Sequence, residues 1–156
     1  MGKRIKNALR VHEIAPWPTT GDAPGENDYL ELAAGIESIT DDTDEDIDDT
    51  VFYDSDGTPS NDVTGISEVW TVEGQRDYDD PAQNYVDSIK RKLLDDRRAW
   101  HRITYTNGKV VEGPCKITNI VAGGGDAGSY EDFSCVLNYS RIPTVTEGTA
   151  GEGSGA

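Results

Sequence analysis

The chain has 156 residues, with 30 acidic and 14 basic side chains and a formal net charge of −16. This length suits a single domain. The charge argues against a protein that binds nucleic acid through its phosphates, because that affinity comes mainly from Lys and Arg. No stretch approaches the ~20 apolar residues of a membrane span, and no apolar run follows the basic segment Met1–Arg10, as it would in a secretory signal.

The charge is distributed unevenly along the chain. Leu, Ile, Val and Phe make up only about 19% of the residues, which is typical of disordered chains, whereas three Trp and seven Tyr favour folding. No Lys or Arg occurs between Val11 and Gln75, and half of the acidic residues lie within Asp22–Asp62. We therefore expect a folded body of mixed charge that an acidic segment interrupts.

The acidic segment is densest at Asp41–Asp49, where seven of nine residues are acidic. Such a run repels itself and stays solvated unless a cationic surface meets it. We predict a long loop over about residues 40–62, with a weak strand at Thr50–Tyr53, and loops of that length are typically functional or disordered. Its candidate contact residues are Asp41, Asp42, Asp44, Glu45, Asp46, Asp48, Asp49, Asp54 and Asp56.

Three β-prone stretches precede the helix signal. We expect a strand at Asn7–Ile14, a second at Tyr29–Ile39 with a break near Gly35, and a third at Ile66–Glu73. The third is the richest in β-branched and aromatic side chains, which favour strands.

An amphipathic helix is predicted from Pro81 to about Arg97. The carboxylate of Asp80 suits the N-cap, and proline suits the first helical position. Tyr85 and Ile89 recur at the four-residue spacing of one helix face. The cations that crowd the second half suit the negative end of the helix dipole.

The rest of the chain has the pattern of a β-meander. We expect strands at Trp100–Thr106, Lys109–Val121 and Tyr130–Ser140. An Asn107-Gly108 pair, the strongest short hairpin signal, joins the first two strands. A looser Gly-rich turn at Ala122–Ser129 joins the second and third.

Period-two alternation gives the last strand an apolar face. That face comprises Phe133, Cys135, Leu137 and Tyr139. If the Gly-rich turn is centred near Gly125, Cys115 lies opposite Cys135 and Ile117 opposite Phe133.

These elements indicate a mainly β protein of the α+β class. A β-sandwich or half-barrel with the single helix on one flank is the natural packing. We expect the domain to span residues 1–145, followed by a flexible Gly-, Ala- and Ser-rich tail at 146–156. Because the core is small, association between copies is expected to supply part of the order.

The sequence contains no catalytic constellation. His12 and His101 lie far apart and lack partners at metal-ligand spacing, so we expect ordinary surface or strand histidines. Cys115 and Cys135 fit two small core thiols, although facing positions across a hairpin also allow a disulfide. With no nucleotide fingerprint and no nucleophile beside a base, we predict no catalytic residue, no cofactor and no enzyme activity.

The acidic segment does not match an EF-hand calcium loop. Four aspartates from Asp42 to Asp48 fit loop positions 1, 3, 5 and 7. Ile47, however, stands where the turn needs Gly, and Tyr53 stands where a bidentate Glu is required. We therefore predict no metal site and interpret the segment as a solvated or partner-binding surface.

The motifs from Ile66 onward occur in a definite order. They are the strand end Val72–Arg76, the helix start Asp79–Ala82, the turn Asn107–Gly108, the strand segment Val110–Gly113, the Gly-rich turn with Gly124–Asp126, and the last strand from Phe133–Ser134 to Arg141–Pro143. Together with the early stretch Tyr29–Ile39, this series resembles the major tail tube proteins of long-tailed phages with non-contractile tails, the siphovirus type. The resemblance covers roughly Asn7–Pro143.

The resemblance implies a β-sandwich with a flanking helix, related to the inner tubes of contractile tails and of type VI secretion systems. Six subunits would form a ring whose strands join into a continuous β-barrel, and stacked rings would form a virion tail tube that conducts DNA at ejection. The loop at residues 41–62 would reach the adjacent ring. Tape-measure and tail-terminator partners, and assembly in the host cytoplasm, are implied in the same way.

The charge agrees with a DNA conduit. An acidic channel repels phosphates, so we expect double-stranded DNA to pass without specific binding, and we expect no membrane partner. Ring closure would also hide open strand edges. The candidate contacts for a neighbour's acidic loop are the basic residues Lys3, Arg4, Lys6, Lys90, Arg91 and Lys92.

Two other functions stay open at this stage. One is a different tail component of the same fold, a distal-tail or tail-completion protein that forms a single ring. The other is a small acidic binding module, calcium-dependent or not, that acts as a monomer.

Overall fold

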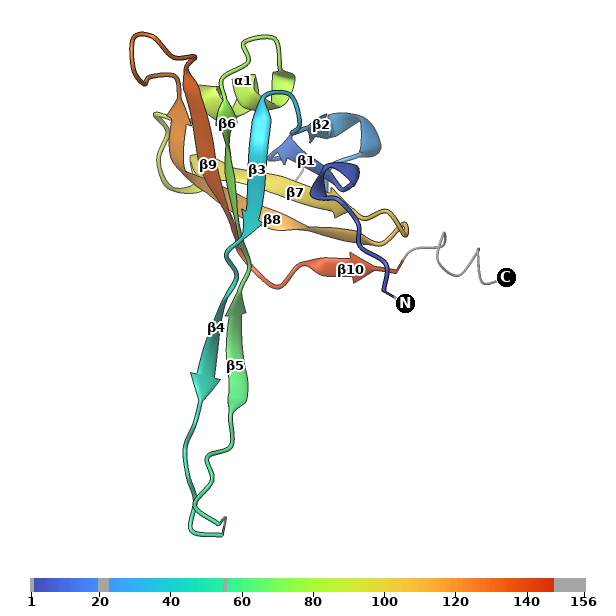
Figure 1. Cartoon of the computed structure of the whole chain (residues 1–156), viewed down its shortest axis with the longest axis vertical. Coiled ribbons are helices and arrows are strands. Elements are labelled where there is room, and N and C mark those ends of the chain that lie inside the picture. The colour runs from blue at the N-terminus through green and yellow to red at the C-terminus, as the bar shows by residue number, and fades with distance from the viewer. Residues whose placement is uncertain (1, 20–22, 55, 148–156) are drawn as a thin grey trace, which may run out of the picture.

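One curled sheet contains most of the strands, and a two-stranded ribbon projects from it (Figure 1). The computed structural model describes residues 2–19, 23–54 and 56–147. The sheet order is β2-β1-β7-β8-β9-β6-β3, with β10 pairing to β8 beside this path, and β4 and β5 form the ribbon. The strands are β1 (Val11–Pro16), β2 (Leu30–Glu31), β3 (Ile36–Asp41), β4 (Asp44–Asp48), β5 (Asp62–Ser67), β6 (Val69–Gln75), β7 (Arg98–Thr104), β8 (Val110–Ala122), β9 (Asp132–Tyr139) and β10 (Thr144–Thr146), and the helices are α1 (Pro81–Ser88) and the 3-10 turns η1 (Asn7–Leu9), η2 (Glu26–Asp28) and η3 (Leu94–Arg97). The predicted mainly β half-barrel with one α-helix is confirmed.

The long strand β8 joins the two parts of the sheet. Its first half pairs with β7 and β10, and its second half pairs with β9. Between Thr118 and Val121 the register shifts at a bulge, where Asn119 has a φ of 51°. Bulges bend a strand and increase its twist. The sheet therefore curls around one side of the core and leaves β2 and β3 as its two outer strands.

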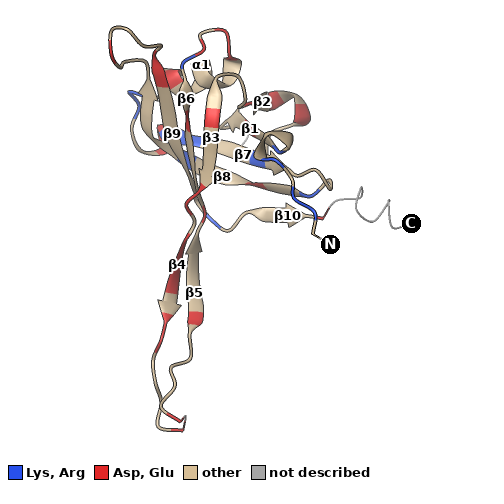
Figure 2. Cartoon of the chain, in the orientation of Figure 1, with Lys and Arg blue, Asp and Glu red and all other residues tan. Residues whose placement is uncertain are grey.

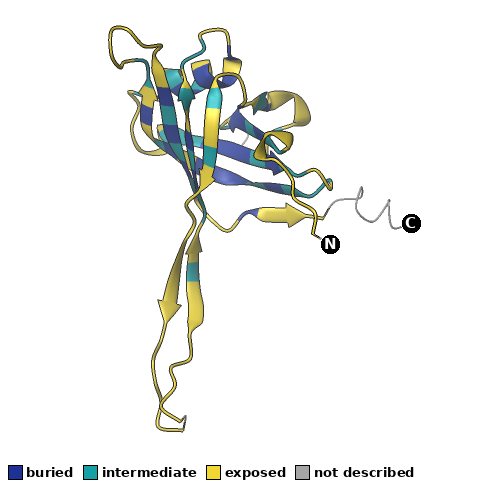
Figure 3. Cartoon of the chain, in the orientation of Figure 1, coloured by how far each residue is buried: buried dark blue, intermediate teal, exposed yellow. Residues whose placement is uncertain are grey.

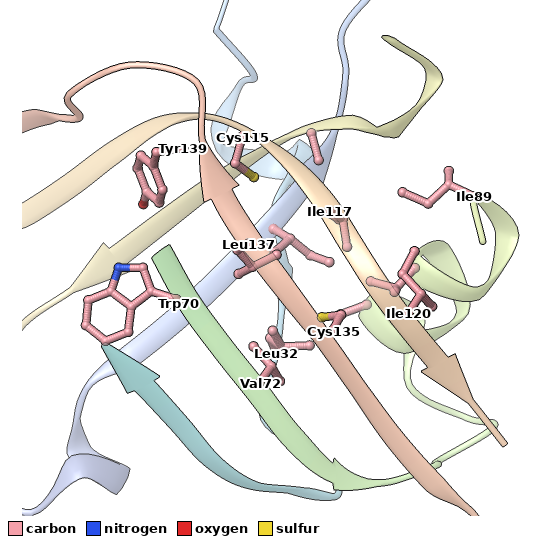
Figure 4. Packing of buried hydrophobic residues seen from close by; sticks show 14 of the residues in the cluster. Leu32, Trp70, Val72, Ile89, Cys115, Ile117, Ile120, Cys135, Leu137 and Tyr139 are labelled. Atoms are coloured by element: carbon pink, nitrogen blue, oxygen red, sulfur yellow. The ribbon is translucent and has the colours of Figure 1, made fainter. Parts of the chain in front are cut away.

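The core lies inside this curl, next to α1. Alternate strand residues point inward, and Val72 of β6, Ile117 of β8 and Leu137 of β9 are completely buried in one cluster (Figure 4). Helix α1 adds Ala82 and Val86 to the same cluster. The apolar face predicted for the last strand is thus confirmed.

The pairing predicted across the Gly-rich turn is wrong, although the faces are right. Cys115 lies opposite Tyr139 and Ile117 opposite Leu137, each four residues away from the predicted partner. The turn occupies residues 123–131, so its centre lies beyond Gly125. Because side chains alternate with period two, an even shift in register keeps the same residues inward.

The two cysteines are free thiols. Cys115 and Cys135 are both buried and are not joined by a disulfide. Burial raises the pKa of Cys135 to about 12, so this thiol stays protonated at neutral pH.

Helix α1 begins as predicted. The carboxylate of Asp80 accepts a hydrogen bond from the backbone N–H of Gln83 at 3.2 Å. The side-chain amide of Gln83 donates to the carbonyl oxygens of Ala34 and Gln75, both at 3.0 Å. The first turn of the helix is therefore tied to the β2–β3 connection and to the end of β6.

The predicted end of the helix at Arg97 is wrong, because α1 stops at Ser88. Beyond it, the guanidinium of Arg97 donates to the carbonyl oxygens of Lys90, Lys92 and Ile117 at 2.5, 2.8 and 2.9 Å. These bonds satisfy carbonyls in a non-helical loop, which competes with continuation of the helix.

Strand boundaries near the N-terminus differ from prediction. The first strand runs from Val11 to Pro16, because Asn7–Leu9 form a 3-10 turn. The break near Gly35 is confirmed, since Gly35 has a φ of 76° between β2 and β3. The stretch predicted as one strand at 66–73 is shared between β5 and β6, and β10 was not predicted. Most of the tail predicted at 146–156 lies outside the described residues.

A chain of buried polar side chains crosses the core between β1, β7 and β9. Arg10 Nε donates to His12 Nε2 at 3.0 Å, and His12 Nδ1 lies 3.1 Å from His101 Nε2. His101 Nδ1 lies 2.8 Å from the hydroxyl of Tyr139. Since Arg10 can only donate, His12 Nε2 carries no proton, so His12 donates from Nδ1 to His101, which in turn donates from Nδ1 to Tyr139. Both histidines are thereby held neutral.

The surroundings lower the proton affinity of both imidazoles. Burial, with a smaller effect from Arg10, lowers the pKa of His12 to about 4. Burial, with a smaller effect from His12, lowers the pKa of His101 well below its ordinary value of 6.5. The expected surface or strand histidines are thus strand residues, but buried ones that pair with each other.

We expect the free energy of unfolding to fall as the pH is lowered from about 6.5 to 4. In this range the histidines of the unfolded chain bind protons and those of the folded chain do not, which costs about 1.4 kcal/mol per pH unit for each. The stabilisation from His12 is complete above pH 6.5 and is lost once the pH falls to its folded pKa of about 4. Urea unfolding at a series of pH values measures this slope.

The matched variant for this measurement is Arg10→Gln. Removing the cation that faces His12 raises the pKa of the folded imidazole, so the loss of stability should become shallower. A free energy of unfolding that stays flat between pH 7 and pH 5 in the parent chain would contradict the prediction.

Candidate functional site

Much of the acidic segment predicted as a loop is a β-ribbon. β4 and β5 pair antiparallel and, with the connecting residues 49–61, form an arm that projects beyond the sheet (Figure 1). Asp42 and Thr43 join β3 to β4, and Glu68 joins β5 to β6, so the arm projects from that edge of the sheet. The strand predicted at Thr50–Tyr53 is wrong, because these residues lie in the connecting loop of the arm.

One face of the arm is apolar. The register places Ile47 opposite Val63 and Glu45 opposite Ile66, and directly opposite residues share a face. Val63 and Ile66 are three positions apart and would point to opposite sides of a regular strand, but a bulge at Thr64 brings them to the same side. Ile47, Val63 and Ile66, here called the apolar face, are 57%, 51% and 42% exposed, and they share this side of the arm with the carboxylate of Glu45.

The other face of the arm carries carboxylates, and Figure 2 shows acidic residues along β4 and at the start of β5. It consists of Asp44, Asp46 and Asp48, which alternate with the apolar side of β4, and of Asp62 opposite Asp48. We call it the aspartate face. Within the described part of the chain none of these four residues forms an ion pair. Like charges placed opposite each other destabilise a strand pair, so this face weakens an isolated arm.

Three Asp-x-Thr turns stiffen the arm and its base. In each, the aspartate carboxylate accepts a hydrogen bond from the backbone N–H two residues on, at 3.0–3.1 Å. The pairs are Asp41 with Thr43, Asp48 with Thr50, and Asp56 with Thr58. The threonine hydrogen bonds lower the pKa of Asp48 and Asp56, so both keep their charge in mild acid. Asp49 and Asp54 lie exposed in the same loop.

The arm presents nearly its whole surface to solvent (Figure 3). Its loop adds Val51, Phe52 and Tyr53 to the exposed apolar side chains. A two-stranded ribbon without a packing partner is marginally stable in water, and large exposed apolar patches mark interaction sites. The arm therefore has the properties of a contact element.

The strands β3, β6, β9 and β8 also leave one sheet face uncovered. Residues such as Val72 and Leu137 point to the core, so their neighbours along each strand point away from it. The register aligns these outward residues in rows across the four strands. They are Thr40, Thr71, Val136 and Thr118 in one row, Ser38, Glu73, Ser134 and Val121 in the next, and Val69, Asn138 and Lys116 in a third. We call this set the open face; its members are at least partly exposed, five of them carry hydroxyl groups, and its basic residue, Lys116, forms an ion pair with Asp95 at 3.4 Å.

The predicted basic contact residues lie in two separate places (Figure 2). Lys3, Arg4 and Lys6 belong to the exposed N-terminal segment. Lys90–Lys92 belong to the loop after α1, on a different side of the body. The structure does not gather the six residues into one patch.

The loop after α1 presents two exposed leucines beside its cations. The sequence pattern did not predict them, because it placed these residues in a helix. Leu93 and Leu94 are 76% and 85% exposed, and Leu94 has a φ of 53°, a costly conformation for a residue other than Gly. The carbonyl hydrogen bonds of Arg97 hold the loop in this shape. Cations next to exposed leucines suit a partner that is both acidic and apolar, as the loop of the arm is.

Residues 2–19, 23–54 and 56–147 contain no group of three or more His, Cys, Asp or Glu arranged to hold a metal. Asp44, Asp46 and Asp48 lie along an extended strand, where alternate residues are ~6.6 Å apart, and do not curl around a common point. Within the same described ranges, no helix is long and apolar enough to cross a membrane.

The fold is similar to that of solved tail and tube structures. A chain from the tail of an empty gene transfer agent particle, determined with C6 symmetry, aligns over 92% of this chain and 99% of its own, with a TM-score of 0.68 and 13% identity. A chain from the virion of the native gene transfer agent particle aligns over 92% of this chain and 99% of its own, with a TM-score of 0.66 and 14% identity. A chain from the cap that terminates the anti-feeding prophage tube aligns over 94% of this chain and 93% of its own, with a TM-score of 0.53 and 13% identity. No protein-family model and no curated protein matches the sequence.

The chain therefore has the fold of subunits from tail and tube assemblies, which confirms the fold that the sequence resemblance implied. These alignments span more than nine-tenths of the chain. Within the described residues, the arm and the open face are surfaces that lack a covering element.

We expect the arm to be dispensable for folding of the body. Replacing Asp44–Ser67 by an Asn-Gly turn removes no residue of the hydrophobic core, so the thermal midpoint of the monomer should change by only a few degrees. The matched control, Val72→Ala, removes core volume and should cost about 2–3 kcal/mol. Circular dichroism melts measure both, and a large drop for the armless chain would mean that the arm packs on its own body.

Proposed function

We propose that this protein is the structural subunit of a virion tail tube, in which hexameric rings stack around a channel that conducts double-stranded DNA. The observation that carries the proposal is the fold of tail and tube subunits, joined to an arm that is marginally stable at best without a packing partner. The proposed role is therefore assembly, and the arm is the element that contacts neighbouring subunits.

The edges of the sheet support lateral association into rings. β2 and β3 are the outer strands of the curl, and a cavity of about 340 Å³ lies between β3 and the residues around His12. Unpaired strand edges invite pairing with other chains. A closed ring of subunits pairs all such edges and so prevents open-ended association. Head-to-tail contacts form a closed ring only when the rotations between successive subunits add up to a full turn. The tail similar in fold was determined with C6 symmetry, which supports six subunits per ring.

The length of the arm supports axial stacking. From Thr43 to Tyr53 an extended chain spans roughly 35 Å, about the diameter of a small domain. An arm of that length reaches across one neighbouring subunit in the next ring. The acidic and exposed apolar residues of its loop then contact the basic loop at Lys90–Leu94 of a neighbour. The N-terminal cations of a neighbour provide a second positively charged contact surface.

The open face supports passage of DNA. It has hydroxyl side chains, one carboxylate at Glu73 and one cation, Lys116, whose charge is paired with Asp95, so it offers little positive charge to hold the phosphates of a duplex. The net charge of −16 adds a repulsive field. In this proposal a tape-measure protein sets the tail length, a terminator protein closes the tube, and assembly takes place in the host cytoplasm.

A terminating ring is the second candidate. The cap of the anti-feeding prophage tube has a similar fold and aligns over 94% of this chain. A cap forms one ring, whereas a tube subunit forms a polymer. The two candidates therefore differ in the length of the assembly and not in the subunit.

We expect the purified protein to form hollow rings or tubes when concentrated. Negative-stain electron microscopy at low and high salt tests this, and the channel should be wide enough for duplex DNA (~20 Å across). Long tubes support the tube subunit, and isolated rings support the cap. A monodisperse monomer under every condition would contradict both.

Reversing the cations of the loop after α1 should weaken assembly. In Lys90→Glu, Arg91→Glu, Lys92→Glu, the loop would repel the acidic loop of a neighbouring arm, so the concentration needed for tubes should rise at least several-fold at low salt. The neutral triple variant to Gln should have an intermediate effect, and high salt should reduce the difference. Sedimentation measures the fraction assembled, and unchanged assembly with unchanged salt dependence would rule out this pairing.

A further inference from the structure

The outer strand β3 takes its position from a side chain of helix α1: we propose that Gln83 holds β3 in place for pairing with a second copy. This inference rests on the proposed tail-tube function, in which outer strands of neighbouring subunits pair within a ring. It makes Gln83 a positioning residue for assembly, although the side chain itself is buried and touches no partner.

β3 is weakly held by its own residues. Within the described part of the chain it pairs with β6 alone, and four of its six residues are exposed. Ile36 and Ile39 pack against the core, and both are only partly buried. At its far end the strand leads into the arm, which has no packing partner (Figure 1). A strand with so few buried contacts opens locally unless another element anchors it.

The side chain of Gln83 anchors the start of β3. It is completely buried, and its Nε2 donates to the carbonyl oxygens of Ala34 and Gln75, both at 3.0 Å. Its Oε1 accepts from the backbone N–H of Asp77 at 2.7 Å and, at 3.4 Å, from the guanidinium of Arg76. Both amide hydrogens and the amide oxygen are thus used. One helix side chain thereby joins the turn before β3 to the end of β6 and to the chain that follows it.

The backbones of β3 and β6 approach each other so closely at this point that no side chain fits between them. The backbone N–H of Gln75 donates to the carbonyl oxygen of Gly35 at 2.7 Å. A Cβ at Gly74 would lie 2.2 Å from that oxygen and 2.7 Å from the Cα of Ile36. Because two glycines meet here, the junction has no side-chain packing of its own. Its geometry therefore depends on backbone hydrogen bonds and on the amide of Gln83.

The amide of Gln83 is needed for these hydrogen bonds and not for filling space. An apolar side chain of similar length could occupy the same volume beside the core residues Ala82 and Val86. It would leave the carbonyl oxygens of Ala34 and Gln75 without this donor, and buried polar groups that lose a partner are costly. The turn would move toward water to regain hydrogen bonds, and the start of β3 would move with it. The damage is thus local to β3.

A fixed β3 favours pairing with another chain for two reasons. Pairing needs one register, because a slip of one residue turns every side chain to the other face of the sheet. In addition, a strand that becomes ordered only on pairing adds the entropy of ordering to the cost of association. Since Gln83 orders the strand beforehand, its loss should weaken ring formation more than it weakens the fold.

The experiment compares three variants of the full chain with the parent. Gln83→Met keeps an unbranched side chain of similar length without the amide. Gly74→Ala disturbs the start of β3 from the side of β6 without changing Gln83. Val86→Ala is the matched control, because it removes core volume from the same helix and takes away no hydrogen bond at the start of β3.

Three measurements are made on each variant. Circular dichroism melts give the thermal midpoint, and sedimentation gives the concentration needed for rings or tubes. Hydrogen exchange followed by mass spectrometry, on dilute unassembled protein, gives the protection of β3 separately from that of β8 and β9.

In Gln83→Met and Gly74→Ala, we expect protection of the β3 amides to fall roughly ten-fold, while β8 and β9 stay close to the parent. The concentration needed for assembly should rise about ten-fold in both variants. Val86→Ala should lower the thermal midpoint but keep the protection of β3 and the assembly concentration within about two-fold of the parent.

Three outcomes would overturn the inference while the proposed function stands. They are unchanged exchange of β3 in Gln83→Met, an equal loss of protection in all strands of that variant, and assembly as weak in Val86→Ala as in Gln83→Met. A parent chain that forms neither rings nor tubes would overturn the proposed function, and the role of Gln83 in assembly with it.

Discussion

A two-stranded β-ribbon has no core of its own, and in the arm the repulsion among four carboxylates adds to that weakness. The ribbon nevertheless has a defined register, a bulge and three Asp-x-Thr turns. Such a structure is marginally stable at best unless something covers its apolar side. The body is stabilised by its own buried cluster, and in the proposed assembly a neighbouring copy would stabilise the arm.

The outer strands of the sheet are a second feature that neighbouring copies would complete in the proposed assembly. The curl of the sheet about β8 leaves β2 and β3 as outer strands, which offer backbone groups for pairing sideways. The arm extends away from the body and offers side chains for packing lengthwise. In the assembly proposed above, pairing at the sheet edges would form the ring and the arm would join one ring to the next.

Local patterns in the sequence predicted the elements of the body well, and long-range ones poorly. The N-cap at Asp80, the Asn107-Gly108 turn and the inward face of β9 depend on neighbouring residues, and all three are confirmed. The end of α1 depends on Arg97 reaching the carbonyl of Ile117 on β8, which no helix signal reports. The pairing of His12 with His101 likewise joins strands that are distant in the chain.

The acidic composition of the sequence identified the segment that forms the candidate site, but its structure as a β-ribbon was not predicted. The run of acids identified the segment, yet a self-repelling run predicts a loop, and only Ile47, Val63 and Ile66 hinted at a strand pair. That hint is hard to read, because Val63 and Ile66 are out of phase for a regular strand. The extra residue at Thr64 corrects the phase, and such bulges have no reliable sequence signal.

Gly65 follows the bulge at Thr64 and lies opposite Asp46. The carboxylate of Asp46 lies across from it, and a Cβ at Gly65 would come within 3.0 Å of Oδ2. The small residue lets the aspartate remain on its own face while the strand shifts phase beneath it. Without that shift, either Val63 or Ile66 would turn to the side of the aspartates. In this chain one inserted residue keeps both apolar side chains on the side opposite to Asp44, Asp46 and Asp48, where Glu45 is the carboxylate that lies beside them.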